Sequence, residues 1–311
     1  MLSYASRRTF STASKGKVGF IGLGNMGFPM MQNCLNAGYE VSAFDTNANT
    51  LTLAEEAGAS IAEKAGHTAK DADFVLTMLP NTMHVVEARV SDDGIYANAK
   101  EGAVIIDSST ISPIVSREMA EDTKEFVIAD APVSGGVPGA TNGTLTFMVG
   151  VEEEHFPTVE GFLNSMGANI FHCGAAGTGQ TAKICNNLTL ALEMIAISEG
   201  LSLGEKLGMD PKILSDIISV STGRCWSIDT YNPRPGVIET APSSSNYMNG
   251  FGTSLMKKDL SIVLDAAEEV QANLGFGEKA MEYYTNVEKQ GFGHRDFSIV
   301  YQYIHKLKAE K

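Results

Sequence analysis

The segment VGFIGLGNMG is the feature that most limits how this 311-residue chain can fold. Its glycines Gly22, Gly24 and Gly27 have the spacing G-x-G-x-x-G, after a strand-like run (17–22) and before an amphipathic stretch (26–37). In this motif the first glycine permits a tight turn, the second lets the backbone approach a pyrophosphate, and the third permits close packing of helix on strand. The N–H groups at the start of the helix then face the phosphates. We therefore predict a dinucleotide-binding loop made of Gly22, Leu23, Gly24, Asn25, Met26 and Gly27.

An acidic residue follows this loop at a suitable distance. Asp45 ends the next strand-like run, EVSAFD, eighteen residues after Gly27. A carboxylate at this place accepts hydrogen bonds from the adenosine ribose hydroxyls and repels a 2′-phosphate. Because no Arg or Lys follows before Lys64, we expect NAD rather than NADP as the cofactor. The alternative is that Asp45 is a turn or helix-cap residue of the segment FDTNAN.

Strand-like and helical patterns alternate from residue 17 to about residue 174. The runs rich in Val, Ile and Phe are KVGFIG, EVSAFD, DFVLTML, AVIIDSS, FVIADAP, LTFMVG and NIFHCG, and amphipathic stretches lie at 26–37, 47–57 and 112–122. This alternation predicts a Rossmann-like α/β domain with a mainly parallel sheet. We assign residues 17–178 to it.

The pattern changes after Gly179, where strand-like runs stop. The segments 180–207, 210–221, 254–274 and 277–290 are long and helical, which predicts an all-helical second domain over residues 179–311. Residues 231–250 are loop-like and unusually long for a connection, so we expect this loop to be functional.

The composition excludes several classes of partner. A net charge of −14 argues against nucleic acid and against an anionic membrane surface, and no apolar run reaches the roughly 18 residues of a membrane span. The four cysteines and six histidines are dispersed. We therefore expect neither a metal site nor a disulfide framework.

The first residues differ from the rest of the chain. The segment MLSYASRRTFSTASKGK is basic and rich in Ser and Thr, and the first acidic residue is Glu40. Such a segment resembles a mitochondrial transit peptide. We expect residues 1–16 to be a targeting leader, cut between Phe10 and Ser11, and the protein to lie in the mitochondrial matrix. The alternative is a tail without a targeting role.

Five motifs, taken in order, resemble those of the β-hydroxyacid dehydrogenases. They are GLGNMG, DSST, APVSGGVPGATNGTLTFMVG, GTGQTAKICNN and GFGTSLMKKDL, and the resemblance extends from residue 17 to the C-terminus. The segment GRCWSIDTYNPRPGV (223–237) is most similar to the family member that acts in valine breakdown. The resemblance implies reversible, NAD-dependent oxidation of the primary alcohol of a 2-methyl-3-hydroxy acid, and a helical domain that supports a dimer or tetramer.

The resemblance also implies roles for single residues. Lys183 corresponds to the catalytic lysine and Asn187 to its neighbour on the substrate. The segment that holds the substrate carboxylate is Ser134, Gly135 and Gly136, and further cofactor contacts are Leu79, Pro80, Thr110 and Lys258.

The chemistry of Lys183 fits this role. A lysine with an ordinary pKa near ~10.4 is a poor base at neutral pH, but burial and a nearby cation, such as Lys258 or the nicotinamide ring, lower that pKa. A proton acceptor works best when its pKa lies near the working pH. Asn187, four residues further on, lies on the same helix face. The alternative is a lysine whose stem covers apolar surface while its amine stays in water.

The segment VSGGV also fits its implied role. Two adjacent glycines leave backbone N–H groups open to a carboxylate, and Ser134 adds a hydroxyl donor. The alternative is a turn at the end of a strand.

Two residues depart from the family pattern. His84 stands where an asparagine is expected, and Arg234 lies in a loop that is usually apolar, where a second cation could bias the choice of substrate toward another acid. The alternatives within the family are tartronate semialdehyde reductase, a short-chain enzyme for 3-hydroxypropionate or serine, and the longer phosphogluconate enzyme, whose set of basic residues for a phosphate is missing here. A cofactor-binding module without catalysis is the alternative of another class, and the presence of Lys183 argues against it.

Overall fold

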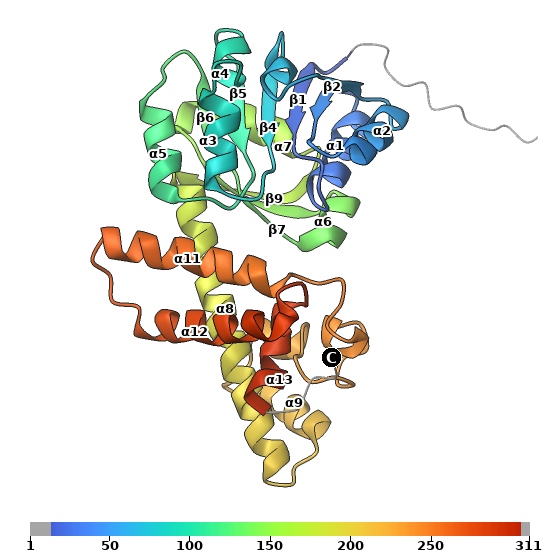
Figure 1. Cartoon of the computed structure of the whole chain (residues 1–311), viewed down its shortest axis with the longest axis vertical. Helices are drawn as coiled ribbons and strands as arrows, with labels where there is room; N and C mark the ends of the chain where they lie inside the picture. The colour runs from blue at the N-terminus through green and yellow to red at the C-terminus, as the bar shows by residue number, and fades with distance from the viewer. Residues whose placement is uncertain (1–13, 306–311) are drawn as a thin grey trace, which may run out of the picture. The chain divides into compact units, whose positions relative to one another are not determined.

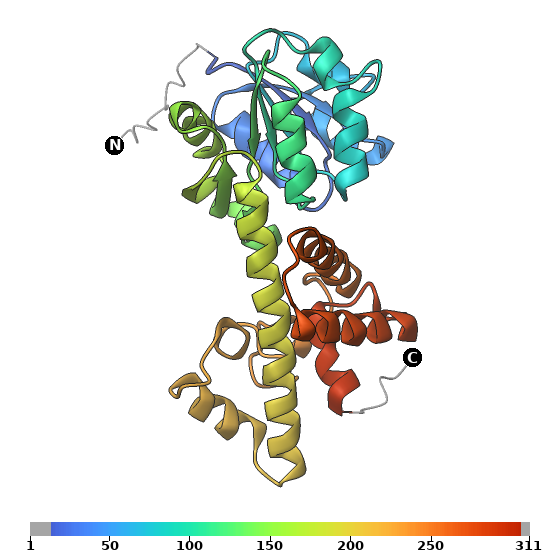
Figure 2. The same cartoon turned by 90° about the vertical axis from the view of Figure 1, so that its left-hand side faces the viewer.

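The computed structural model describes residues 14–305, so the expected cleavage site and most of the expected leader lie outside the described residues. The chain divides into two units (Figures 1 and 2). The first unit ends at Gly179, and the second begins at Gln180. The short segment Thr110–Ile114 belongs to the second unit although the first unit surrounds it in the sequence.

The described part of the first unit is built on one sheet of nine strands, in the order β3-β2-β1-β4-β5-β6-β8-β7, with β9 paired to β8. Neighbours from β3 to β6 are parallel, whereas β8 is antiparallel to β6 and β7 and parallel to β9. The strands are β1 (Lys17–Ile21), β2 (Glu40–Phe44), β3 (Ser60–Ile61), β4 (Phe74–Thr77), β5 (Val104–Asp107), β6 (Val127–Asp130), β7 (Val133–Ser134), β8 (Leu145–Gly150) and β9 (Gly167–Gly174). The predicted mainly parallel sheet is confirmed.

The central strands β1, β4 and β5 are buried on both faces of the sheet, whereas β9 is largely exposed. Phe20 and Leu76 belong to one apolar core, together with side chains of α1 and α7, whereas their neighbours Ile21 and Val75 belong to a second core with residues of α3 and α4. Because successive side chains of a strand point to opposite faces, a sheet covered on both sides needs continuous apolar runs. The helices of this part of the chain are α1 (Gly27–Asn36), α2 (Ala48–Glu56), α3 (Thr82–Val90), α4 (Ile95–Asn98), α5 (Pro113–Glu121), α6 (Gly136–Asn142) and α7 (Phe156–Leu163).

The second unit is helical, as predicted. Its helices are α8 (Thr178–Lys206, which starts at the end of the first unit), α9 (Pro211–Ser219), α10 (Trp226–Asp229), α11 (Thr253–Glu269), α12 (Gly275–Val287) and α13 (Val300–His305). Its main core joins Met194 of α8, Leu260 of α11 and Tyr284 of α12. Between residues 180 and 305 the only β-pairing is an isolated bridge from Gly252 to Asp296.

The connection over residues 231–250 contains no α-helix or strand, but it is firmly held. Buried Asp296 accepts hydrogen bonds from the Tyr231 hydroxyl (2.7 Å) and from the backbone N–H of Phe251 (2.7 Å). Arg234 donates from Nε to Glu205 (3.0 Å) and from Nη1 to the Pro235 carbonyl (2.6 Å). The guanidinium charge is therefore paired with a carboxylate inside the second unit.

Candidate functional site

The glycine-rich loop has the geometry that the motif requires. Gly22 turns the chain with φ +93°, and a Cβ on Gly27 would lie 1.9 Å from the Gly22 carbonyl oxygen. By contrast, a Cβ on Gly24 would meet nothing within 4 Å, so the backbone is open there. Helix α1 begins without a side-chain cap. An open backbone beside an uncapped helix N-terminus fits the pyrophosphate of a dinucleotide.

Replacing Gly27 by alanine is expected to lower the melting temperature and to weaken NADH binding at least tenfold, because the new methyl group forces the loop away from the helix. Gly161→Ala is the matched control, since a Cβ there meets nothing within 4 Å inside α7. Thermal unfolding and NADH fluorescence measure the two effects. Equal behaviour of the two variants would contradict this account of the loop.

Asp45 is tied to the glycine-rich loop. Its Oδ2 accepts the N–H of Leu23 at 2.6 Å, and its Oδ1 accepts the N–H of Asn47 at 2.8 Å. The side chain that caps α2 belongs to Asn47. Asp45 is therefore a turn residue, though not the cap of α2, and its carboxylate lies beside the loop where a ribose is expected.

The loops after β4 and β5 lie side by side. The backbone N–H of Leu79 donates to Ser109 Oγ at 2.8 Å, and Pro80 is exposed. His84 is exposed in α3, where its backbone N–H donates to the capping side chain of Asn81 (3.1 Å).

Ser134, Gly135 and Gly136 form the turn from β7 into α6. The two glycines have φ of +130° and +61°, a region that favours glycine, and both are exposed. The turn itself thus explains the glycine pair, and it leaves both residues exposed.

The second unit brings four predicted residues together. Lys183 and Asn187 lie on α8, and Asn187 Nδ2 donates to Asp259 Oδ2 of α11 at 2.6 Å. Lys258 Nζ lies 2.8 Å from Asp259 Oδ1 and donates to the Thr110 carbonyl at 2.9 Å. Asn187 and Asp259 are only 3 % and 2 % exposed, so their polar groups depend on these contacts.

Burial lowers the pKa of Lys183, and the charge of Lys258 lowers it further, whereas the charge of Asp259 raises it. The net pKa is below that of an ordinary lysine. Both lowering effects have the direction expected for burial and for a nearby cation. A neutral amine is what a proton acceptor requires.

The sequence reasoning missed Asp259, and it placed Gln180 on the helix face of Lys183 without foreseeing its partner. Asp259 stands in the KKDL motif, but its contact with Asn187 joins two residues that are 72 positions apart in sequence. Buried Gln180 accepts the N–H of Ile111 at 3.1 Å and so fixes the segment Thr110–Ile114 in the second unit. Residue type and spacing on α8 alone would not reveal either partner.

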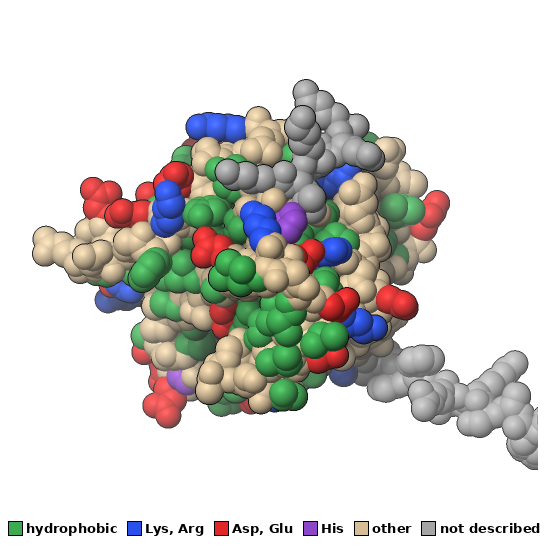
Figure 3. Space-filling model, turned by 90° about the horizontal axis from the view of Figure 1, so that it is seen from below, with side chains coloured by type: hydrophobic (Ala, Val, Ile, Leu, Met, Phe, Trp, Pro, Cys, Tyr) green, Lys and Arg blue, Asp and Glu red, His purple; other side chains and the backbone are tan. Residues whose placement is uncertain are grey.

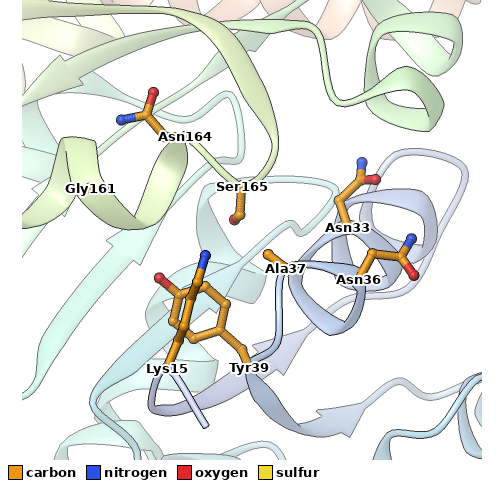
Figure 4. A pocket seen from close by; sticks show the side chains of 8 residues that line it. All are labelled: Lys15, Asn33, Asn36, Ala37, Tyr39, Gly161, Asn164 and Ser165. Atoms are coloured by element: carbon orange, nitrogen blue, oxygen red, sulfur yellow. The ribbon is translucent and has the colours of Figure 1, made fainter. Parts of the chain in front are cut away.

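A pocket of about 340 Å³ in the first unit lies elsewhere (Figure 4). Lys15 and Tyr39, which line it, precede β1 and β2, so the pocket is at the amino ends of these strands. Ligands of such sheets bind at the carboxyl ends, which rules this pocket out as the dinucleotide site. Among residues 14–305 no group of three or more metal-ligating side chains gathers, and no helix there is long and apolar enough to cross a bilayer.

Comparison with known proteins identifies both parts of the chain. Residues 17–174 match the NAD-binding domain of 6-phosphogluconate dehydrogenase, and residues 177–304 match the NAD-binding domain of NADP-dependent 3-hydroxyisobutyrate dehydrogenase. The mitochondrial 3-hydroxyisobutyrate dehydrogenase of Mus musculus is 47 % identical over 94 % of this chain and 88 % of that protein. A probable mitochondrial enzyme of the same name from Dictyostelium discoideum is 45 % identical over 98 % of this chain and 96 % of that protein.

A solved structure agrees with these relatives. The 3-hydroxyisobutyrate dehydrogenase of Mycobacterium tuberculosis, described with L-serine, is 40 % identical, has a TM-score of 0.87, and covers 94 % of this chain and 99 % of its own. The resemblance that the motifs carried is confirmed. The chain, an oxidoreductase with an NAD-binding first domain, belongs to the 3-hydroxyisobutyrate dehydrogenase family.

Proposed function

We propose that this protein oxidises 3-hydroxyisobutyrate to methylmalonate semialdehyde with NAD, as a step of valine degradation in the mitochondrial matrix. The observation that carries the proposal is the buried contact of Asn187 with Asp259 beside Lys183, a lysine whose pKa is lowered. The names of the relatives support the substrate and the organelle.

In this proposal Lys183 moves the proton. Its neutral amine accepts the proton of the substrate hydroxyl as the carbinol carbon loses a hydride, which leaves the aldehyde. NAD, when bound, supplies the acceptor for that hydride. The amine must be unprotonated at the start, and burial favours this state.

The other residues orient the substrate. Asn187 is one helical turn beyond Lys183, and its amide is held by Asp259, so it can hold the hydroxyl without first losing side-chain freedom. Ser134 and the open N–H groups of Gly135 and Gly136 hold the carboxylate. Leu79, Pro80, Thr110 and Lys258 contribute to the cofactor site.

A panel of substrates tests the proposal. The specificity constant kcat/KM is measured for 3-hydroxyisobutyrate, glycerate, L-serine and 3-hydroxypropionate, and 3-hydroxyisobutyrate is expected to lead. A lead for L-serine, the compound named with the mycobacterial structure, would move the assignment to a sister activity. NADH binding without turnover of any of these acids would indicate a binding module instead.

Asp45 is proposed to select NAD over NADP. Asp45→Ala is expected to narrow the ratio of kcat/KM for NAD to that for NADP about tenfold, because repulsion of the 2′-phosphate is lost. Since Asp45 also accepts the N–H of Leu23, some loss of NAD affinity should accompany the change. Asp45→Asn, which keeps an acceptor oxygen, separates the two effects. An unchanged ratio in both variants would show that another residue makes the choice.

We further propose that the protein forms a dimer or tetramer through its helical unit. Large apolar side chains are exposed near the end of α8 and along α9, including Leu207 (78 %) and Ile213 (56 %). Figure 3 views the molecule from this end and shows hydrophobic side chains gathered among charged ones. Light scattering during size-exclusion chromatography measures the molar mass of the protein in solution, which is expected to be that of a dimer or a tetramer.

A further inference from the structure

Asp107, the last residue of β5, is the centre of a buried hydrogen-bond network in the first unit. It is 1 % exposed, and its Oδ1 accepts the hydroxyls of Thr77 (2.7 Å) and Ser109 (2.6 Å) and the N–H of Ser109 (3.2 Å). Thr77 ends the neighbouring strand β4. One carboxylate oxygen thus ties together the carboxyl ends of two adjacent parallel strands.

The network continues into the loop after β4. Ser109 donates its hydroxyl proton to Asp107, and its oxygen accepts the backbone N–H of Leu79 at 2.8 Å. The hydrogen bonds therefore run in one direction, from Leu79 through Ser109 to Asp107. Such chains polarise each member and fix the geometry of the groups at both ends.

A buried arginine accompanies this carboxylate. Arg89 of α3 is 1 % exposed, and its charge lowers the pKa of Asp107 against the larger opposite effect of burial. Arg89 Nη1 lies 3.9 Å from the sulfur of Met119, while its Nε and Nη2 have no hydrogen-bond partner among the described residues. A full charge in such a place is costly to keep unless an opposite charge compensates it, and Asp107 is the carboxyl group on which Arg89 acts.

We propose that Asp107 and Ser109 are positioning residues for the cofactor, with Arg89 as the counter-charge that keeps the carboxylate in place. They hold the backbone of Leu79, and with it Pro80, in the conformation that receives NAD. This inference rests on the proposed contact of Leu79 and Pro80 with the cofactor. Neither of the two positioning residues, nor Arg89, touches the substrate in this proposal.

Ser109→Ala tests the link with the smallest change. It removes the acceptor of the Leu79 N–H but leaves both buried charges, so the fold is expected to persist. The KM for NAD and the dissociation constant of NADH are expected to rise about fivefold, the worth of one buried hydrogen bond. The KM for 3-hydroxyisobutyrate and kcat should stay within about twofold.

Ser165→Ala is the matched control, because it removes a hydroxyl that donates to the Phe162 carbonyl (2.8 Å) elsewhere in the first unit. This variant should change neither the KM for NAD nor the KM for 3-hydroxyisobutyrate. If Ser109→Ala leaves NADH affinity unchanged, or changes both KM values and kcat alike, the positioning role is wrong. A wild-type protein that binds NADH but oxidises none of the acids would refute the proposed function but not the positioning role. The effect of Ser109→Ala on NADH affinity could still be measured in that case.

A pair of variants at Asp107 tests the role of charge. Asp107→Asn keeps an acceptor oxygen but leaves Arg89 uncompensated, so the melting temperature should fall. The double variant Arg89→Met/Asp107→Asn removes both charges and keeps the acceptor, so stability and NADH affinity should both recover. If the double variant folds but binds NADH as poorly as Ser109→Ala, then Arg89 does more than compensate the charge of Asp107, and its assignment as a counter-charge is wrong.

Discussion

Replacing Lys183 by alanine is expected to lower kcat about 10³-fold, within the range of general acid–base catalysis, while NADH binding stays unchanged. The reason is that the amine is the proposed acceptor of the hydroxyl proton, whereas the glycine-rich loop belongs to the first unit. Stopped-flow or steady-state formation of NADH measures the first effect, and fluorescence titration with NADH measures the second. A rate near that of the wild type would refute the role of Lys183.

Lys257→Ala is the matched control for this variant. Lys257 is also a lysine of the second unit, but its amine pairs with Glu288 at 2.5 Å and is not part of the Lys258–Asp259 contact. Its removal should leave kcat within about twofold of the wild type. A loss equal to that of Lys183→Ala would point to general damage of the helical unit instead of a lost proton acceptor.

Asp259→Asn is expected to give the second largest effect, a loss of about 10- to 100-fold in kcat/KM. Asparagine can still accept the Asn187 amide, but the ion pair with Lys258 is lost. The variant should also shift the pH dependence of kcat/KM in a defined direction. Because the charge of Asp259 raises the pKa of Lys183, its removal lowers that pKa, and the neutral amine persists to lower pH. The acidic limb of the profile of kcat/KM against pH should therefore move to lower pH.

Asp265→Asn provides the comparison, since Asp265 lies on the same helix but is exposed. It should leave both the rate and the pH profile unchanged. An acidic limb that moves to higher pH in Asp259→Asn, or stays in place, would contradict the electrostatic influence of Asp259 on Lys183.

The sequence predicts the central elements of the first unit because their signals are local. Each of the seven predicted strands is a short run rich in Val, Ile and Phe, and each lies in the observed sheet. The strands β3 and β7 have two residues each and were missed, since so short a segment shows no periodicity. The predicted helices 26–37, 47–57 and 112–122 correspond to α1, α2 and α5, with small shifts at their ends.

The candidate site is less visible in the sequence because its contacts join distant segments. Motifs located Lys183 and Lys258, but the acid between Lys258 and Asn187 was not foreseen. Arg234, whose effect on substrate choice the sequence leaves open, gives a second example: its partner Glu205 comes 29 residues earlier in the chain. Pairing of charges depends on tertiary structure, which spacing in sequence does not reveal.

The assignment of Thr110–Ile114 to the second unit has a consequence for how the chain folds during synthesis. These residues leave the ribosome about seventy residues before Gln180, which accepts the N–H of Ile111, and well before Lys258, which donates to the Thr110 carbonyl. A fragment ending at Gly179 would contain every strand of the described sheet. It would not contain residues 180–311, the rest of the unit to which the buried residue Ile111 belongs. The segment Thr110–Ile114, which begins with the proposed cofactor residue Thr110, can therefore form its contacts with Gln180 and Lys258 only after the helical unit has been synthesised.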